Sequence, residues 1–491
     1  MKRLAFIFFV TFCLADLGGT IACAQGPGSE KGTAVSEVKR LNRAPVSKEI
    51  LRVKLPRPRE TKLANGLTVL VLEQHKLPTV AFTLWVKTGA LADPKDLPGL
   101  AKATAEMLRE GTTHRTSAQL AAEVDGLGAS LMASAEFGAD TSTVSASGLS
   151  ESTERLLELM SDVVLNPTFP ADEFAIYQKR QLAQVEQMRA RPGFLAQERF
   201  HKVLYGDFAA AIVSATPASL KAMTTMQLKD FHDRYYAPNN ALLGVVGDVR
   251  FDEVVSLLEK SFGAWQGHTV APPDLGKISP PAPTKIALVD RPHSVQTNIL
   301  AGDFAVRRAD PDFIPLTVMN RVLGGGASAR LFLNLREKHG YTYGAYSSFT
   351  SDIYPGAWRA NTEVRNAVTD GSLHELMEEF KRIRTQPVPE SELDEARRSI
   401  VASFALSLEQ PPALLNFWMT ADYFRLPQDY WDRYPEQVAK VSPEAVEQAA
   451  KKYVDLDHLQ FVCVGDGKQI KDTLKKYGPV DIYDADGKRL E

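Results

Sequence analysis

The segment Ala241-Leu-Leu-Gly-Val-Val-Gly-Asp248 is matched in the second half of the chain by Leu459-Gln-Phe-Val-Cys-Val-Gly-Asp466. Both are apolar runs that end in Gly-Asp, and each follows a predicted helix and a polar turn that contains Tyr. A short apolar run without alternation indicates a strand buried on both faces. The spacing between the two runs is far longer than a solenoid repeat, so we interpret them as parts of a duplicated domain.

The beginnings of the two copies correspond as well, with Leu67-Thr-Val-Leu-Val-Leu72 in the first and Lys285-Ile-Ala-Leu-Val-Asp290 in the second. Residues 267–283 lie between the copies and contain five prolines, a composition that favours an extended linker over a packed element. We therefore predict an N-terminal domain at residues 59–266 and a C-terminal domain at residues 284–491.

Short β-rich runs alternate with long helical patterns inside each copy. In the first copy the pattern of a strand at 79–88 is followed by helical spacing of apolar residues at 97–109, 116–127, 152–165 and 171–191. Strands that pair as hairpins and mix with helices in this way are typical of α+β layers. The predicted fold class is therefore α+β, with two similar domains.

Residues 1–24 have the pattern of a secretory signal peptide. Two basic residues precede an apolar run at 4–15, and Ala22-Cys23-Ala24 matches the small-residue cleavage site. The apolar run is too short to span a bilayer as a stable helix, so we predict cleavage after this site and no integral membrane segment in the mature chain. Lipidation at Cys23 is the minor alternative. We therefore expect a periplasmic or secreted protein that begins with an N-terminal extension at 25–58.

The composition argues against several classes of function. The chain has 491 residues, of which 44% are hydrophobic and 24% charged, as in ordinary globular proteins. Its formal net charge of −3 provides no electrostatic attraction to nucleic acid or to an anionic membrane, so neither is expected as a partner. After signal cleavage Cys463 is the one remaining cysteine, which leaves no internal disulfide, and its apolar surroundings predict a small core residue in a buried strand.

Short motifs in both copies have the order and spacing of one family. They are Asn65-Gly-Leu67, Gly99-Leu-Ala101, Met107-Leu108, Gly111-Thr112, Tyr235-Tyr-Ala-Pro-Asn-Asn240 and Val246-Gly-Asp248 in the first copy, and Leu323-Gly-Gly-Gly326, Ser328, Arg330-Leu-Phe332 and Leu335-Arg-Glu-Lys-His-Gly-Tyr-Thr-Tyr343 in the second. On these residues the chain resembles the insulinase/pitrilysin-type metallopeptidases over nearly all of its mature length. The resemblance implies two similar α+β domains per chain, which form half of a clam-shell chamber that takes in unfolded peptides.

The zinc motif of that family is degenerate in this chain. By the resemblance, Lys102 and Glu106 stand at the two His of His-x-x-Glu-His, and Ala105 stands at the Glu that acts as general base. The family's third ligand is a Glu on the helix at 171–191, where the central carboxylate, Glu186, aligns more readily with an acid that supports the ligands. A lysine ammonium has no lone pair for Zn²⁺, alanine cannot act as a base, and no two of the nine His lie within five residues of each other. We therefore predict no metal site and no cofactor in this chain.

Lys102 and Glu106 have two interpretations. Their i,i+4 spacing suits an ion pair on a helix that is kept for structure, in the weaker order with Lys N-terminal to Glu, worth at most about 0.5 kcal/mol. The alternative is that Glu106, or Glu186, keeps some contact with a metal.

The resemblance also implies substrate-binding residues in the second copy. Arg336 and Tyr343 have the spacing of an Arg and a Tyr that hold the substrate backbone near the metal of the other half. The chemistry fits, because a guanidinium offers planar charge-assisted donors to a carbonyl and a phenol can stabilise an oxyanion. The alternative is an Arg paired with a neighbouring acid and a Tyr on a strand face, from which Tyr341 would point the opposite way. Gly324-Gly325-Gly326 is expected to form a tight turn after a helix, with contact to substrate as the alternative.

These observations lead to one hypothesis and two alternatives. The hypothesis is a non-catalytic, substrate-positioning subunit of an exported heteromeric zinc peptidase that acts on unfolded peptides. Its homologous partner would carry His-x-x-Glu-His and the zinc. The first alternative is a peptide-binding or scaffold protein of the periplasm without a protease partner, and the second is a protease that acts alone through an unusual site.

Overall fold

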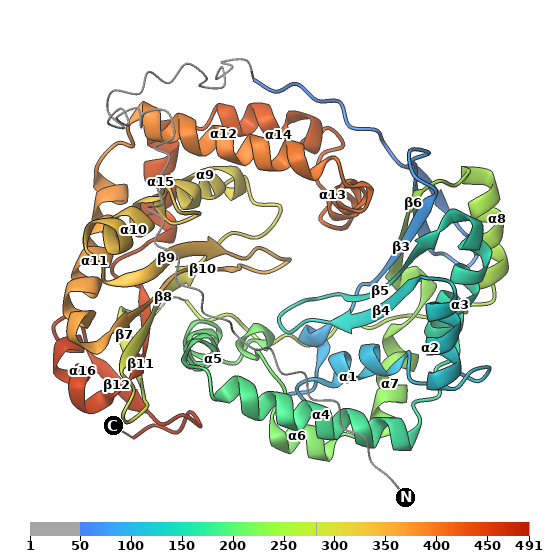
Figure 1. Ribbon diagram of the computed structural model, residues 1–491, viewed down its shortest axis with the longest axis horizontal. Coiled ribbons are helices and arrows are strands. Elements are labelled where there is room, and N and C mark those ends of the chain that lie inside the picture. Colours follow the sequence, from blue (N-terminus) through green and yellow to red (C-terminus); the bar gives the residue numbers. More distant parts are fainter. Residues whose placement is uncertain (1–49, 281, 491) are drawn as a thin grey trace, which may run out of the picture. The chain divides into compact units, whose positions relative to one another are not determined.

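A computed structural model of the protein describes residues 50–280 and 282–490. The predicted signal peptide and residues 25–49 of the predicted N-terminal extension lie outside the described residues. Two mixed sheets and the helices that cover them make up the described chain (Figure 1). In this part of the chain no helix is both long and apolar enough to cross a membrane. The α+β class expected from the sequence is confirmed.

The first sheet has six strands in the order β1-β2-β6-β3-β5-β4. Its strands are β1 (Arg59–Lys62), β2 (Thr68–Glu73), β3 (Thr79–Val86), β4 (Ser130–Ala135), β5 (Ser142–Leu149) and β6 (Ala241–Gly247). β2 and β6 are parallel, and all other neighbours in this sheet are antiparallel.

The second sheet has the order β12-β7-β11-β8-β10-β9. Its strands are β7 (Lys285–Asp290), β8 (Gln296–Phe304), β9 (Thr342–Phe349), β10 (Ala357–Arg365), β11 (Gln460–Gly465) and β12 (Val480–Tyr483). The run β7-β11-β8-β10-β9 repeats the order and directions of β2-β6-β3-β5-β4 in the first sheet. The duplication expected from the sequence is therefore present in the topology.

The helices of the first copy are α1 (Leu100–Met107), α2 (Ser117–Gly126), α3 (Thr153–Leu165), α4 (Ala171–Arg189), α5 (Pro192–Tyr205), α6 (Pro217–Ala222), α7 (Thr225–Tyr235) and α8 (Phe251–Phe262). Those of the second copy are α9 (Phe313–Leu323), α10 (Arg330–Phe332), α11 (Thr369–Thr385), α12 (Glu390–Ser407), α13 (Pro411–Tyr423), α14 (Tyr430–Ala439), α15 (Pro443–Tyr453) and α16 (Gly467–Leu474). Pro192 follows α4 and occupies the first position of α5, where its missing N–H costs no hydrogen bond.

The two repeated segments form β6 and β11, which occupy equivalent positions in the two sheets and are buried along their whole length. Their side chains alternate between two cores. In β11, Phe461 and Cys463 belong to the core that contains α9, α11 and α15, while Val462 and Val464 pack with α5. Burial on both faces explains the unbroken apolar run, and Cys463 is a buried core residue as expected.

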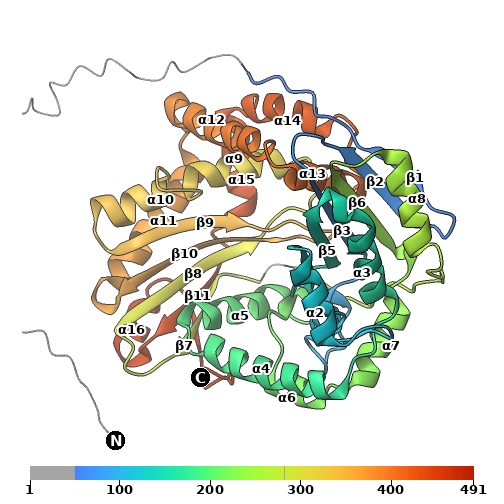
Figure 2. The same cartoon turned by 45° about the vertical axis from the view of Figure 1, so that its right-hand side comes forward.

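Each sheet is covered on one face by a helix from the other copy. α13, from the second copy, packs on β6 of the first sheet, and α5, from the first copy, packs on β8 and β11 of the second (Figure 2). A glycine makes room for each helix: a Cβ on Gly244 would meet Leu415 and Met419 of α13, and a Cβ on Gly302 would meet the ring of Phe200 of α5. Neither sheet is therefore buried on both faces by its own copy alone.

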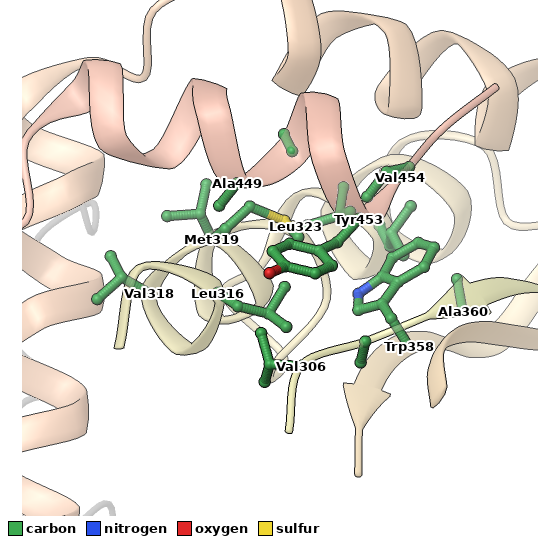
Figure 3. Packing of buried hydrophobic residues seen from close by; sticks show 14 of the residues in the cluster. Val306, Leu316, Val318, Met319, Leu323, Trp358, Ala360, Ala449, Tyr453 and Val454 are labelled. Atoms are coloured by element: carbon green, nitrogen blue, oxygen red, sulfur yellow. The ribbon is translucent and has the colours of Figure 1, made fainter. Parts of the chain in front are cut away.

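A large core lies between the second sheet and its outer helices. In Figure 3, Trp358 of β10 and Tyr453 of α15 pack with Met319 and Leu323 of α9. The Trp358 ring is fully buried, and its Nε1 donates a hydrogen bond to Asn320 Oδ1 at 3.1 Å, which satisfies the polar atom of the ring. This packing fixes α9 and β10, the two elements on either side of β9.

Two carboxyl groups lie at another contact between the copies. Asp140 in the β4–β5 loop and Asp352 in the β9–β10 loop are close enough to share a hydrogen bond, and Tyr423 of α13 donates a hydrogen bond to Asp140. Tyr354 Oη donates another across the same contact, to Gly138 O at 2.7 Å. Burial and the charge of Asp140 raise the pKa of Asp352 to about 7. Below that pH the pair therefore holds a proton.

Substituting Gly302 by Ala is expected to lower the free energy of unfolding by about 1–3 kcal/mol. The added Cβ would lie 2.4 Å from the Trp358 carbonyl oxygen and 2.5 Å from the Phe200 ring. Gly126→Ala is the control, since nothing lies within 4 Å of its Cβ and Ala in a helix is favoured over Gly by roughly 0.5–1 kcal/mol. Urea unfolding of both variants measures the difference, and equal stabilities would contradict close packing of α5 on the second sheet.

The Asp140–Asp352 pair predicts a pH-dependent stability. Because the folded-state pKa of Asp352 is raised to about 7, the folded chain binds more protons than the unfolded chain between about pH 4 and 7. This contribution to stability is lost as the pH rises through that window. Asp352→Asn removes the titration, so the unfolding free energy of the variant should improve relative to wild type up to about pH 8 and then level off. Urea unfolding across that range measures this, and a difference that does not change with pH would contradict the shared proton.

Candidate functional site

Helix α1 carries the degenerate motif and begins at a tight turn. Gly99 precedes it with φ of +96°, and the Asp93 carboxylate accepts the N–H groups of Gly99 and Ala101 at 2.6 and 2.7 Å. A Cβ on Gly99 would also lie 2.9 Å from the Ala215 Cβ. Burial raises the pKa of Asp93 to about 7, against the backbone hydrogen bonds that favour its charged form. This turn, rather than the apolar pattern, sets where the helix begins.

An ion pair occupies the motif positions. Lys102 Nζ lies 2.7 Å from Glu106 Oε1, one turn along α1, as expected from the i,i+4 spacing. The other carboxylate oxygen of Glu106 accepts a hydrogen bond at 3.2 Å from Gln181 Nε2 on α4. Tyr177 lies one turn earlier on α4, and its burial, together with the charge of Glu106, raises its pKa. Both oxygens of Glu106 are thus engaged by protein donors.

These residues do not fit a zinc site. Zn²⁺ takes at least three protein ligands, and the motif offers one carboxylate that is already paired with an ammonium. Ala105 is 0% exposed, so water does not reach the position at which the family has its base. Glu186 is exposed and lines a cavity of about 1070 Å³ that does not include the ion pair. Across residues 50–280 and 282–490, no group of three or more His, Cys, Asp or Glu is arranged to hold a metal ion.

Sequence reasoning missed Gln181 and Tyr177, which face the motif from α4. They lie one helical turn apart, so their spacing predicts a shared helix face. The packing of the two helices decides which face of α4 contacts α1, and a local sequence pattern does not predict this packing. Asp93 was missed for a similar reason, because it caps α1 only when the chain folds back on itself.

Arg336 lies in a π-helical turn, Leu333–Lys338, that directly follows α10. Its Nη1 lies 3.0 Å from Glu337 Oε1, and its guanidinium carbon lies 4.8 Å from the centre of the Phe332 ring. π-Helical turns are rare and frequently occur at functional sites. Arg336 is therefore paired with the neighbouring acid, and it sits on a backbone turn of a kind that often carries functional residues.

Buried polar contacts tie this turn to α11. Asn334 Nδ2 donates to Glu375 Oε2 at 2.9 Å and to Glu379 Oε1 at 2.8 Å. Arg382 Nη1 donates to the same oxygen of Glu379 at 2.9 Å. Hydrogen bonds in a buried setting are stronger than in water and fix one arrangement of the groups that make them. The backbone turn that carries Arg336 is thus fixed by hydrogen bonds to α11.

Tyr343 lies on β9, the outermost strand of the second sheet, and is 92% exposed. Tyr341 has the opposite environment, since its ring stacks on His339 with centroids 5.0 Å apart and packs against the core. Side chains two positions apart on one strand point to the same face, so alternation along a strand does not explain this difference. β9 begins at Thr342, and Tyr341 lies before the strand, after the turn that ends at Lys338. Tyr343 therefore presents both its ring and its hydroxyl to a ligand from solution.

The run Gly324-Gly325-Gly326 forms the predicted turn after α9. Ser347 N of β9 donates to Gly324 O at 2.9 Å, and a Cβ on Gly324 would lie 2.4 Å from that nitrogen. Arg321 donates a hydrogen bond to the Gly325 carbonyl. Glycine is needed here because the turn lies directly against the β9 backbone.

The second copy thus brings the predicted glycine turn, Tyr343 and the unpredicted turn that carries Arg336 to one strand. The glycine turn lies on β9, Tyr343 projects from it, and the π-helical turn leads into it after a hydrogen bond from Gly340 N to Arg336 O at 3.0 Å. The degenerate motif belongs to the first sheet, where α1 packs against β4 and β5. Chemically, the motif offers an ion pair without metal ligands, and the second group offers exposed donors that can bind a peptide backbone.

Two family models match the chain. The model for insulinase, peptidase family M16, matches residues 68–217, and the model for the peptidase M16 inactive domain matches residues 222–400. A protein of Mycobacterium leprae that is named an uncharacterized zinc protease is 29% identical over 371 residues, which cover 73% of this chain and 80% of that protein.

Solved structures show the same fold. The crystal structure of a peptidase M16 inactive domain from Pseudomonas fluorescens has a TM-score of 0.76 at 30% identity, covering 83% of this chain and 97% of that chain. The periplasmic protease PqqL of Escherichia coli has a TM-score of 0.72 at 15% identity, covering 85% of this chain and 46% of that chain. At that identity the likeness to PqqL concerns the fold alone.

The burial of the motif predicts different costs for two substitutions on α1. Ala105→Glu is expected to lower the free energy of unfolding by about 2 kcal/mol or more, because it forces a carboxylate into a position that water does not reach. Lys102→Ala, the control, should cost less than about 1 kcal/mol, because the ion pair is partly exposed. Thermal or urea unfolding of the two variants tests this, and similar costs would contradict the described environment of the motif.

Proposed function

Because the chain belongs to the insulinase peptidase family M16, we propose that it is a non-catalytic subunit of an exported, heteromeric zinc peptidase. In this proposal the chain positions unfolded peptides, and a homologous partner that carries His-x-x-Glu-His binds the zinc and cleaves them. The observation that carries the proposal is the Lys102–Glu106 ion pair on a retained motif helix. The match of residues 222–400 to an inactive-domain model supports it.

Peptide hydrolysis in this family needs a metal-activated water and a general base. The chain has an ammonium at one ligand position and a carboxylate engaged by two donors at the other, and Ala105 has no proton acceptor. The helix itself is still required, because Leu100 and Met107 of its buried face are part of the first core. Keeping the helix while losing its ligands is what we expect of a subunit whose partner holds the metal.

Arg336 and Tyr343 are the side chains proposed to position the substrate. The guanidinium can donate to a peptide carbonyl once it leaves Glu337, and this exposed ion pair costs little to break. The Tyr343 hydroxyl can donate to the oxyanion that forms during hydrolysis, provided that the partner brings its zinc to this strand. Gly324, Gly325 and Gly326 keep the adjacent turn flat against β9, which would let a peptide approach the backbone.

The sheet edges offer a second means of holding a peptide. In the described chain β4 pairs with β5 as its one neighbouring strand, and β9 with β10, although Ser347 N of β9 is bonded to Gly324 O of the glycine turn. An unpaired strand edge can bind an extended peptide by main-chain hydrogen bonds, as in β-augmentation. Such binding depends little on side chains, so it suits unfolded peptides of varied sequence.

We propose that this subunit acts in the periplasm or outside the cell. The proposal is based on the signal-peptide pattern of residues 1–24. Zinc is expected in the partner, and no cofactor is expected in this chain.

A second candidate function is a peptide-binding or scaffold protein that works without a protease partner. The exposed Tyr343 and the position of β4 and β9 at the sheet edges favour it as well, because binding by these groups needs no metal. The two functions differ in whether a zinc-carrying homologue is associated with the chain.

Purification of the tagged chain from its native cells is expected to recover a homologue that contains His-x-x-Glu-His, identified by mass spectrometry. The recovered complex should cleave unfolded peptides, and a chelator should abolish the cleavage because it removes zinc from the partner. Recovery of the chain without any such homologue would instead support the scaffold function.

Arg336→Ala is expected to lower the kcat/KM of the complex by about 10- to 100-fold, the loss of one charge-assisted hydrogen bond to substrate. Lys338→Ala is the matched control, because it removes an exposed positive charge from the same turn. Both variants should assemble normally, as judged by gel filtration. Equal activity of the two variants would show that Arg336 does not hold the substrate.

A further inference from the structure

A cavity of about 380 Å³ lies in the second copy, outside the candidate site. Aromatic residues of α12, α13 and α14 form its apolar wall, namely Phe404, Phe417, Trp431 and Tyr434. The rings pack on one another, with centroids 4.4 Å apart for Phe417 and Trp431 and 5.1 Å apart for Phe404 and Tyr434. A cavity of this size and lining suits a small organic molecule.

Arg308 lines the same cavity and is 7% exposed. Its guanidinium carbon lies 4.0 Å from the centre of the Phe313 ring and 5.5 Å from that of Trp431, and its Nη1 donates a hydrogen bond to Tyr430 Oη at 3.2 Å. Among the described residues, no carboxylate oxygen lies within the 4.0 Å of an ion pair with it. A guanidinium stays protonated in proteins, so this buried positive charge has no protein anion beside it.

Three acids beside the rings that contact Arg308 are occupied by other cations. Three carboxylates stand at the beginnings of α9 and α14, the helices that begin with Phe313 and Tyr430. They are ion-paired elsewhere, Asp312 with Lys452 at 2.6 Å, Asp429 with Arg433 at 3.5 Å and Asp432 with Arg57 at 2.9 Å. The charge of Arg308 therefore remains available to an anion that enters the cavity.

A second guanidinium and three hydroxyl groups face the cavity from its other side. Ser399, Ser403 and Ser407 line it at intervals of four residues, from one face of α12. Arg321 lines it as well, and its Nη2 donates to Ser399 Oγ at 2.5 Å. In the described chain this guanidinium also lacks an ion-pair partner. Positive charge and hydroxyl donors thus surround an aromatic wall.

We propose that this cavity is a binding site for a small organic carboxylate with an aromatic or branched apolar body. The carboxylate would accept charge-assisted hydrogen bonds from Arg308 and hydrogen bonds from the serine hydroxyls, while the apolar body packs on the rings. The bound anion would supply the counter-charge that the protein lacks at this place. This site is separate from the proposed peptidase role and does not depend on it.

A ligand bound in the cavity would affect the glycine turn, because Arg321 contacts both. Its Nη1 donates to the Gly325 carbonyl, and a Cβ on Gly326 would lie 3.0 Å from the same nitrogen. A carboxylate is a stronger acceptor than a serine hydroxyl or a carbonyl, so a ligand in the cavity would compete for this guanidinium. The contacts that hold the turn against β9 would change with it.

Isothermal titration of the full chain with N-acetyl-L-phenylalanine tests the site. We expect binding with a Kd below about 1 mM, and binding at least about tenfold weaker for the neutral analogue N-acetyl-L-phenylalanine amide. Arg308→Met should abolish binding of the acid, and Arg433→Met, which removes an exposed charge of α14, should leave it unchanged.

Ser403→Phe provides a second test that leaves the core intact, because Ser403 is exposed at the mouth of the cavity and a phenyl ring there would fill it. We expect loss of binding with an unchanged unfolding midpoint. The proposal is overturned if wild type does not bind the acid at about 10 mM, if acid and amide bind equally, or if Arg308→Met or Ser403→Phe binds as wild type does.

Discussion

The two copies of the repeat depend on each other through an exchange of helices, in which α13 covers a face of the first sheet and α5 covers a face of the second. Leu70 and Leu72 would face water without α13, as would Val462 and Val464 without α5. Burying each such side chain contributes about 1.5–3 kcal/mol, so neither copy can keep its sheet buried alone. Because of this exchange the second copy packs on the first sheet through α13, and the first copy packs on the second sheet through α5.

In the first copy, folding and peptidase chemistry depend on different residues of α1. α1 has to be present because its apolar face fills the first core, whichever residues stand at its polar positions. Lys102 and Glu106 form a partly exposed ion pair that stabilises the fold by at most about 0.5 kcal/mol. Replacing metal ligands by this pair therefore changes the free energy of unfolding little. A chain that works beside a zinc-carrying partner can lose them freely. Under the proposed function it would still have to keep the groups that position the peptide, and Arg336 and Tyr343 are exposed on the second copy.

Local sequence patterns predicted the elements in which all residues share one environment. The apolar runs predicted β6 and β11 because both faces of these strands are buried, and the glycine run predicted the turn after α9. The exchange of α5 and α13 was not predicted, since an amphipathic helix does not record which sheet it will cover. The π-helical turn at Leu333–Lys338 was missed because it is tied to α11 by hydrogen bonds from Asn334 to residues 41 and 45 positions away. Gln181 was missed likewise, because it meets Glu106 only after α4 packs on α1.

Zinc content and peptide cleavage, measured on the purified chain alone, test most directly whether this protein is non-catalytic. Atomic emission spectroscopy gives the zinc bound per chain, and an unfolded peptide assayed with and without added zinc gives the activity. We predict far less than one zinc per chain and no cleavage in either condition, because the motif helix offers a single carboxylate that is already paired with an ammonium. One zinc per chain, together with cleavage that a chelator abolishes, would contradict the assignment.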